Sequence, residues 1–328
     1  MWQNIRGHDQ TVEWFRARIA AGRLASTYLF IGPDGIGKRL FARKLAAALL
    51  CTSSEPVAME PCGNCEACQT VASGNHPDVD EVGLPEGKKT LPIELFIGDR
   101  EHRNREGLCH NIALRPLSGR RRVAIIDDAD WLSVESANCL LKTLEEPPPG
   151  AVIILIGTSR SRQLPTILSR TQLVRFSPLP TPDLAALLEQ QGVALGAEAQ
   201  ELAQRAGGSL ALAREMSDPT LAQLATRLAR HAEQGDLAIA QFAAEINELV
   251  NAAGSEAQVR RGRIRQVATL AAGSLRERLR AACTDEPQLD ADRLVSLIER
   301  CLDVETHVDR NDNQALVIES WLDAMAGV

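Results

Sequence analysis

The chain has 328 residues, which is enough for two or three domains with hydrophobic cores. Hydrophobic residues make up 45% of it and charged residues 24%, and no run of eighteen apolar residues occurs, so a disordered chain, a disulfide mini-scaffold and a membrane-spanning protein are excluded. The net charge of −7 and the 3% of aromatic residues argue against a protein that binds nucleic acid unaided. The first residues lack the pattern of an export signal, so we expect a cytoplasmic protein.

The first half of the chain alternates between helical and strand patterns. Apolar residues at helical spacing predict helices, and short continuous apolar runs predict buried strands. In chain order these are a helix at 11–21, a strand at 28–31, a helix at 40–50, a strand at 122–126, a helix at 133–144 and a strand at 151–156. Alternation of this kind favours an α/β fold, a parallel sheet with helices on both faces.

The character of the sequence changes after Phe176. A proline-rich connection occupies residues 177–182, and almost everything beyond it is helical in pattern. Gly207 and Gly208 interrupt the first helical stretch, and a second boundary is expected near Asp218. We therefore predict an α/β domain at 1–178, a small helical subdomain at 179–217 and an all-α domain at 218–328.

A phosphate-binding loop is predicted between the strand at 28–31 and the helix that follows. Gly32, Gly35 and Gly37 allow backbone N–H groups to face an anion, and Lys38 is the residue that reaches terminal phosphates. The next position should carry a hydroxyl that coordinates Mg²⁺, but here it is Arg39, which cannot ligate a cation. The pattern indicates a P-loop ancestry and argues against ATP hydrolysis; a plain glycine turn is the alternative.

The strand at 122–126 ends in acids, as a Walker B segment does. Asp127 stands where Mg²⁺ is held, and Asp128 stands where a longer glutamate normally orients the attacking water. The alternative is a solvated acidic strand end.

Four of the eight cysteines crowd into one short segment, at Cys51, Cys62, Cys65 and Cys68. Gaps of two residues let successive thiolates converge on one ion, and the loop after Cys51 is long enough to fold back and complete a set of four. The segment 51–68 is therefore predicted to hold a closed, structural Zn²⁺ site. The alternative is a chance grouping of reduced core cysteines.

One longer motif, NCLLKTLEEPP at residues 138–148, resembles the signature of bacterial clamp-loader subunits, the AAA+ proteins of DNA polymerase III. Gly7-His8, the loop at 32–39 and the run at 126–130 agree with it. The resemblance is specific over residues 1–215 and only architectural beyond. It implies an AAA+ domain with a zinc insertion, then a helical lid and a helical collar. It also implies a five-subunit ring with gamma/tau and delta subunits that loads the sliding clamp onto primed DNA.

The resemblance carries over to single positions with some departures. Ser169 and Arg170 match the family's Ser-Arg-Cys motif, whose arginine enters the neighbouring subunit's ATP site, although Thr171 replaces the cysteine. Thr158 matches the position that senses the γ-phosphate. Ala211 stands where active members have an arginine as second sensor. The resemblance therefore implies a non-hydrolysing stator that lends Arg170 to a neighbour; whether its altered loop binds a nucleotide stays open.

Two alternatives remain at this point. One is an active ATPase, a gamma/tau-like motor of the same loader, which Arg39 and Ala211 oppose. The other is an independent zinc-containing nucleic-acid binder, which the acidic charge opposes. Two groups of arginines, at 100–122 and 260–280, are interpreted as solvated or protein-contacting surface and are assigned no site. Contact with phosphates in an assembled complex is the alternative for both groups.

Overall fold

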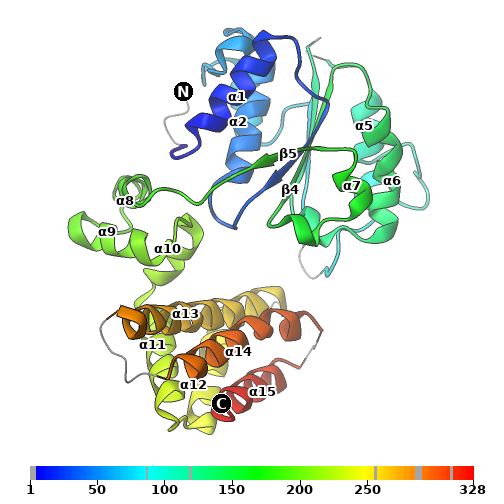
Figure 1. Ribbon diagram of the computed structural model, residues 1–328. Helices are drawn as coiled ribbons and strands as arrows, with labels where there is room; N and C mark the ends of the chain where they lie inside the picture. The colour runs from blue at the N-terminus through cyan, green and yellow to red at the C-terminus, as the bar shows by residue number, and fades with distance from the viewer. Residues whose placement is uncertain (1–4, 86–87, 118–119, 255–256, 285–289, 311–312) are drawn as a thin grey trace. The chain divides into compact units, whose positions relative to one another are not determined.

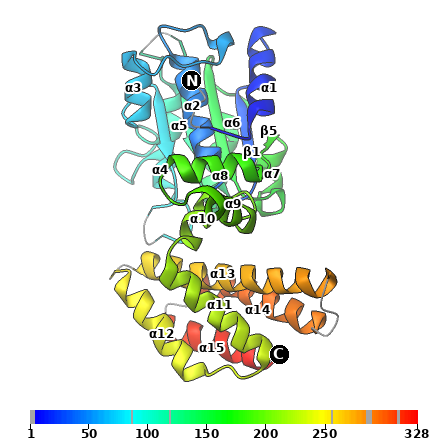
Figure 2. The same cartoon turned by 90° about the vertical axis from the view of Figure 1, so that its left-hand side faces the viewer.

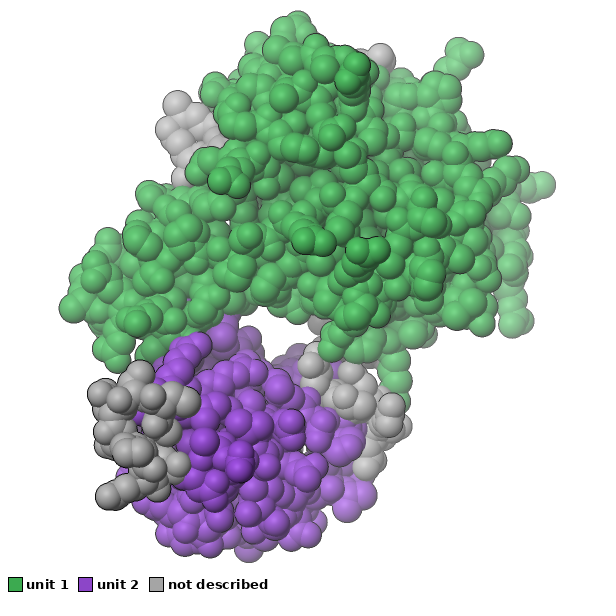
Figure 3. Space-filling model, viewed as in Figure 1, with its two compact units in different colours: residues 1–211 green, residues 212–328 purple. Residues whose placement is uncertain are grey.

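The computed structural model describes residues 5–85, 88–117, 120–254, 257–284, 290–310 and 313–328. The chain divides into two compact units, residues 1–211 and 212–328, which Figure 3 shows in different colours. The finer division into three domains stays a prediction. No helix in the described ranges is both long and apolar enough to cross a membrane.

The first unit is built on a five-stranded parallel sheet with the order β2-β3-β4-β1-β5 (Figure 1). The three predicted strands are confirmed within one residue at each end, and two further strands, β2 and β5, were not predicted. The strands are β1 (Thr27–Ile31), β2 (Val79–Val82), β3 (Arg122–Ile126), β4 (Ala151–Gly157) and β5 (Gln172–Arg175).

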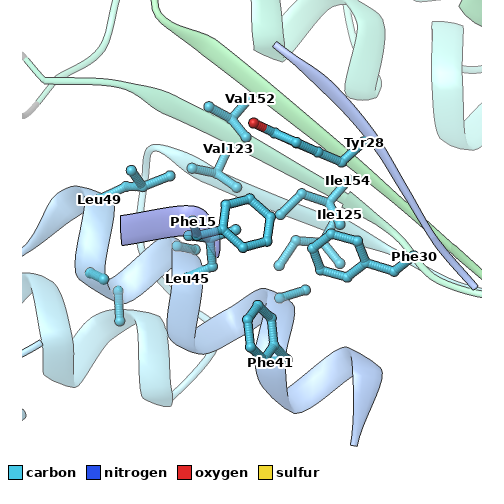
Figure 4. Packing of buried hydrophobic residues seen from close by; sticks show 14 of the residues in the cluster. Phe15, Tyr28, Phe30, Phe41, Leu45, Leu49, Val123, Ile125, Val152 and Ile154 are labelled. Carbon is cyan, nitrogen blue, oxygen red and sulfur yellow. The ribbon is translucent and has the colours of Figure 1, made fainter. Parts of the chain in front are cut away.

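The three central strands are buried along their whole length, as expected for a sheet covered on both faces. Because side chains alternate along a strand, β1 supplies Tyr28 and Phe30 to one core and Leu29 to the other. Phe15 and Phe41 pack against the first of these sets, as Figure 4 shows. The predicted α/β class with helices on both faces is confirmed.

Helices α1 and α2 lie side by side on one face of the sheet, and α5 and α6 lie on the other (Figures 1 and 2). The helix α2 begins at Lys38, directly after the glycine loop, and ends at Leu50, just before the cysteine segment. The helices before residue 180 are α1 (Asp9–Ala20), α2 (Lys38–Leu50), α3 (Glu66–Ala72), α4 (Glu94–Ile97), α5 (Leu108–Ala113), α6 (Val134–Glu145) and α7 (Pro165–Leu168). Three short 3₁₀ turns accompany them, η1 (Pro56–Ala58), η2 (Ala129–Trp131) and η3 (Arg160–Arg162).

A short helical segment follows the sheet. It consists of α8 (Thr181–Gln190), α9 (Gly196–Arg205) and α10 (Leu210–Met216). The predicted glycine break lies between α9 and α10, where Gly207 and Gly208 both have positive φ. A Cβ on Gly208 would lie 2.5 Å from the Cβ of Pro178, so only glycine fits this close passage.

The second unit is all α. Its helices after α10 are α11 (Pro219–Gln234), α12 (Ile239–Ala252), α13 (Ala257–Thr284), α14 (Ala291–Arg310) and α15 (Gln314–Ala326). The helix α13 packs against α11 and α14, and α12 packs against α15. Buried residues at helical spacing, such as Leu221, Leu224 and Leu228, form its interior.

Candidate functional site

The carboxyl edge of the parallel sheet gathers the predicted nucleotide-site residues. Ile31 at the end of β1 pairs with Gly157 at the end of β4, so the glycine loop and Thr158 leave the sheet at the same edge. Asp127 follows β3, which is the neighbour of β4. This edge is where ligands bind in open parallel sheets, and the structure brings the predicted residues together there.

The glycine loop has the backbone of a phosphate loop, but its lysine is turned onto the loop itself. Gly35 and Gly37 have φ of 74° and 97°, in the left-handed region that favours glycine. The Lys38 ammonium is buried and donates hydrogen bonds of 2.6 Å to the carbonyl oxygens of both Gly32 and Pro33. Burial lowers the pKa of Lys38. The donors that would meet a terminal phosphate are thus engaged by the backbone.

Arg39 lies at the acids that a magnesium site would use. Its Nε donates to a carboxylate oxygen of Glu81 and lies 3.4 Å from Oδ2 of Asp127. Arg43, one helical turn later, donates to the other oxygen of Glu81 at 2.7 Å. Burial, followed by the charge of Asp128, raises the pKa of Asp127, and the Arg39 guanidinium opposes that rise. A positive side chain therefore lies beside the carboxylates where a metal cation would have to bind, so these residues do not fit a Mg²⁺ ion.

The acids after Asp127 are also engaged within the chain. Asp128 has a positive φ of 56°, and its side chain accepts a hydrogen bond of 3.1 Å from the backbone N–H of Leu84. Asp130 accepts hydrogen bonds from both the N–H and the hydroxyl of Thr158 and from the amide of Gln163. The Thr158 hydroxyl therefore donates its hydrogen bond to the Asp130 carboxylate.

The start of α10 and the residue before it contact the glycine loop. The Leu210 N–H donates to the Gly35 carbonyl at 3.0 Å, and the Ser209 hydroxyl donates to the Asp34 carbonyl at 2.9 Å. A Cβ on Gly35 would lie only 2.5 Å from the Cβ of Ala211. The residue at the second-sensor position therefore packs against the loop, and as an alanine it offers no charge to a phosphate.

Arg170 and Ser169 lie just before β5, after the short helix α7. The Thr27 hydroxyl donates to the Arg170 carbonyl at 2.8 Å and anchors this backbone to the start of β1. The Arg170 side chain remains 30% exposed and pairs with Glu145 at the end of α6. Its Nη1 donates to the Ser169 hydroxyl oxygen at 2.9 Å. Glu81 and Glu145 are the contacting residues that sequence reasoning missed.

The four predicted zinc ligands converge. The sulfur atoms of the four cysteines all lie within 4.8 Å of one another, with Cys51 and Cys65 at 3.8 Å and Cys62 and Cys68 at 4.0 Å. Four thiolates around one Zn²⁺ at about 2.3 Å would be separated by about 3.8 Å, so the set fits a tetrahedral site. Backbone N–H groups of Cys65 and Cys68 donate to the sulfurs of Cys62 and Cys65. Such donors stabilise thiolates, the form that binds metal.

The cysteine segment is tied to the rest of the first unit by two arginines. Arg120 donates to the carbonyl oxygens of Cys51 and Ser54, and Arg16 on α1 donates to that of Ala58 at 3.1 Å. These bonds fix the loop that returns the chain from Cys51 to Cys62. The positions of the four cysteines therefore depend on hydrogen bonds from Arg120 and Arg16 as well as on their spacing in the sequence.

The interpretation of residues 100–122 as surface arginines is wrong for Arg122 and incomplete for Arg120. Arg122 is only 6% exposed and lies 3.6 Å from the fully buried carboxylate of Asp78. It also donates to the carbonyl oxygens of Asn111 and Pro77. A buried guanidinium needs such partners, so Arg122 is part of the structural interior of the first unit.

The family described as DNA polymerase III, delta subunit, matches residues 7–180, which is more than half of the chain. The chain belongs to this family. The motif at 138–148, together with Gly7-His8, the loop at 32–39 and the run at 126–130, resembles the delta-prime type of subunit most closely. The family match and the relatives named delta' confirm that prediction.

Among proteins of known name, the delta' subunit of Pseudomonas aeruginosa is 39% identical over 189 residues, 56% of this chain and 53% of that protein. The delta' subunit of Bacillus subtilis is 33% identical over 175 residues, 53% of this chain and 49% of that one. A gamma/tau subunit of Mycobacterium tuberculosis is 35% identical over 208 residues, 62% and 34% of the two chains. The matches thus span about half the length of the delta' relatives and a third of the gamma/tau relative.

A solved structure of a DNA polymerase III gamma subunit-related protein from Thermotoga maritima aligns with 96% of this chain and 98% of its own, at 19% identity and a TM-score of 0.48.

We predict one zinc per chain, lost in the variant Cys65→Ser. Because a structural metal contributes directly to folding, this variant should exchange backbone hydrogens faster around residues 51–70 than the parent chain does. Metal analysis by mass spectrometry and hydrogen exchange check the two parts. Cys109→Ser, which alters a cysteine outside the cluster, is the control and should keep its zinc; a zinc content near zero in the freshly purified parent chain contradicts the prediction.

Proposed function

We propose that this chain is a non-hydrolysing stator subunit of the DNA polymerase III clamp loader. In this role it would assemble with gamma/tau and delta subunits into a five-membered cytoplasmic ring and help to load the sliding clamp onto primed DNA. The names of its relatives support the loader, and the geometry of the loop at 32–39 supports the stator role. It would have no ATPase or polymerase activity of its own.

The observation that carries the stator role is the position of Arg39. In a working site Mg²⁺ bridges the phosphate oxygens and neutralises charge that develops during transfer. Here a guanidinium lies 3.4 Å from Asp127 and is paired with Glu81, so a divalent cation would be repelled where it must bind. Asp128, one methylene shorter than the usual glutamate, and Ala211, which carries no charge, are two further departures from the pattern of a hydrolysing site.

We propose further roles for the four-cysteine cluster and for the helical part of the chain after residue 178. The four-cysteine cluster would hold a structural Zn²⁺, residues 179–217 would form the lid of an AAA+ module, and residues 218–328 would form the collar. The second unit offers apolar side chains at its surface, among them Val295 and Leu302, which are 43% and 49% exposed. Such side chains are suited to packing between subunits.

Arg170 is proposed as the finger that this chain supplies to a neighbour's ATP site, with Ser169 beside it. A guanidinium is always charged and matches the geometry of phosphate oxygens. The backbone of Arg170 is anchored by Thr27, and its side chain is partly exposed at the surface of the first unit. Both features are consistent with a group presented to a partner.

The isolated chain is expected to show no appreciable ATPase activity. Arg39→Thr alone should not restore it, because Asp128 would still be too short to orient the attacking water well and Ala211 would still leave the second sensor without charge. Release of inorganic phosphate from Mg·ATP measures this directly. Turnover by the parent chain at the level of ordinary AAA+ enzymes would instead support the motor alternative.

Arg170→Ala should preserve assembly and lower the DNA-stimulated ATPase of the complete loader. An arginine supplied in trans contributes about 10³–10⁵ in rate at the site it serves, but a ring with several ATP sites loses only one of them. We therefore expect a partial loss of total turnover at saturating ATP, clamp and primed DNA. Arg175→Ala, an exposed arginine on β5, is the matched control. Equal turnover of the Arg170 variant and the parent would remove Arg170 from the mechanism.

A further inference from the structure

The guanidinium of Arg170 is held by acceptors of its own chain. Its Nε donates to the Glu145 carboxylate at 2.7 Å, and its Nη2 lies 2.5 Å from the same oxygen. Its Nη1 donates to the Thr166 carbonyl at 3.0 Å and to the Ser169 hydroxyl at 2.9 Å. All three nitrogens of the group therefore have an acceptor in the same chain.

This arrangement conflicts with simultaneous contact to a phosphate. A guanidinium binds phosphate best through two parallel N–H donors on one edge. On Arg170 the Nε and Nη2 edge faces Glu145, and Nη1 is shared between Thr166 and Ser169. The side chain must release at least one of these partners before it can hold a phosphate with two donors.

Glu145 is poorly explained by helix stability alone. It is the last residue of α6, where the partial negative charge of the helix end disfavours an acid. Its pairing with Arg170 compensates for that position. Glu145 is 49% exposed, so the pair is weak enough to exchange, as ion pairs near water are.

We infer that Glu145 is a positioning residue for Arg170 and holds the guanidinium back until a neighbour's nucleotide phosphate displaces the carboxylate. The inference rests on the proposed finger role of Arg170. A terminal phosphate carries more negative charge than one carboxylate and offers three acceptor oxygens, so it can win this exchange when the two subunits meet. The Thr27 hydroxyl anchors the Arg170 backbone throughout, and only the side chain has to move.

The test compares Glu145→Gln with Glu146→Gln in the complete loader. Glu146 is the adjacent exposed acid, and its side chain makes no hydrogen bond or ion pair with the described residues. Loss of the competing charge in Glu145→Gln should lower the ATP concentration for half-maximal ATPase by about two- to fivefold, the range that a partly exposed ion pair supports. The maximal rate should stay within about twofold of the parent's, and Glu146→Gln should match the parent in both quantities.

A second measurement follows the pair in the isolated chain. The Arg170 Nε–H should exchange with water more slowly in the parent than in Glu145→Gln, as nitrogen-15 NMR measures, with Glu146→Gln unchanged. Equal exchange in the parent and Glu145→Gln would show that the pair does not hold the guanidinium.

ATPase measurements on the complete loader distinguish the finger role of Arg170 from the positioning role of Glu145. If Arg170→Ala lowers turnover while Glu145→Gln leaves the half-saturating ATP concentration unchanged or raises it, the inference about Glu145 is overturned and the finger role stands. If Arg170→Ala has no effect, the finger role and the inference both fail.

Discussion

The proposed stator role depends on the ion pairs that Arg39 makes with Glu81 and Asp127. Arg39 brings a permanent positive charge to Glu81 and Asp127, two acids that are each less than a fifth exposed. Without a cation, the pair of partly buried carboxylates would repel one another and favour protonation. In a hydrolysing P-loop protein the cation is a metal held with the nucleotide. In this chain the positive charge beside Glu81 and Asp127 is the Arg39 side chain, which offsets the negative charge of the two carboxylates without a metal ion.

Other polar groups of the glycine loop at 32–38 are also hydrogen-bonded within the chain. The Lys38 ammonium is bonded to Gly32 and Pro33, and the loop is capped by Ser209 and Leu210. These bonds join the glycine loop after β1 to the start of α10. A ring member with this construction would be suited to remain in one conformation while its neighbours change.

Much of the fold was predictable because its signals are local. The buried strands β1, β3 and β4 are continuous apolar runs, and the spacing of the four cysteines predicted that their sulfur atoms would lie close together. The strands β2 and β5 were missed because each is short, with polar residues among its four, so neither shows a clear strand period. Their position comes from pairing with β3 and β1, which sequence periodicity does not reveal.

The same limit explains which site residues were found. Arg39 and Arg170 stand at motif positions, so the sequence alone singles them out. Glu81 and Glu145 are distant in sequence from their partners, and only the folded chain brings them together. Arg122 looked like part of a surface group because a run of arginines has no pattern that separates a buried member from its solvated neighbours. Its burial depends on Asp78, an acid supplied by the turn before β2.

The claim that Arg39 takes the place of a metal is tested most directly by calorimetric titration of the full chain with ATP. The titration is run in buffer with Mg²⁺ and in buffer without Mg²⁺ or chelator, with the zinc content verified in both. If Arg39 takes the place of the metal, ATP will either not bind or bind with a dissociation constant that Mg²⁺ changes by less than about twofold. Binding of Mg·ATP more than about tenfold tighter than ATP alone, a difference of about 1.4 kcal/mol, would show that a metal contributes to nucleotide binding despite Arg39 and would contradict this claim.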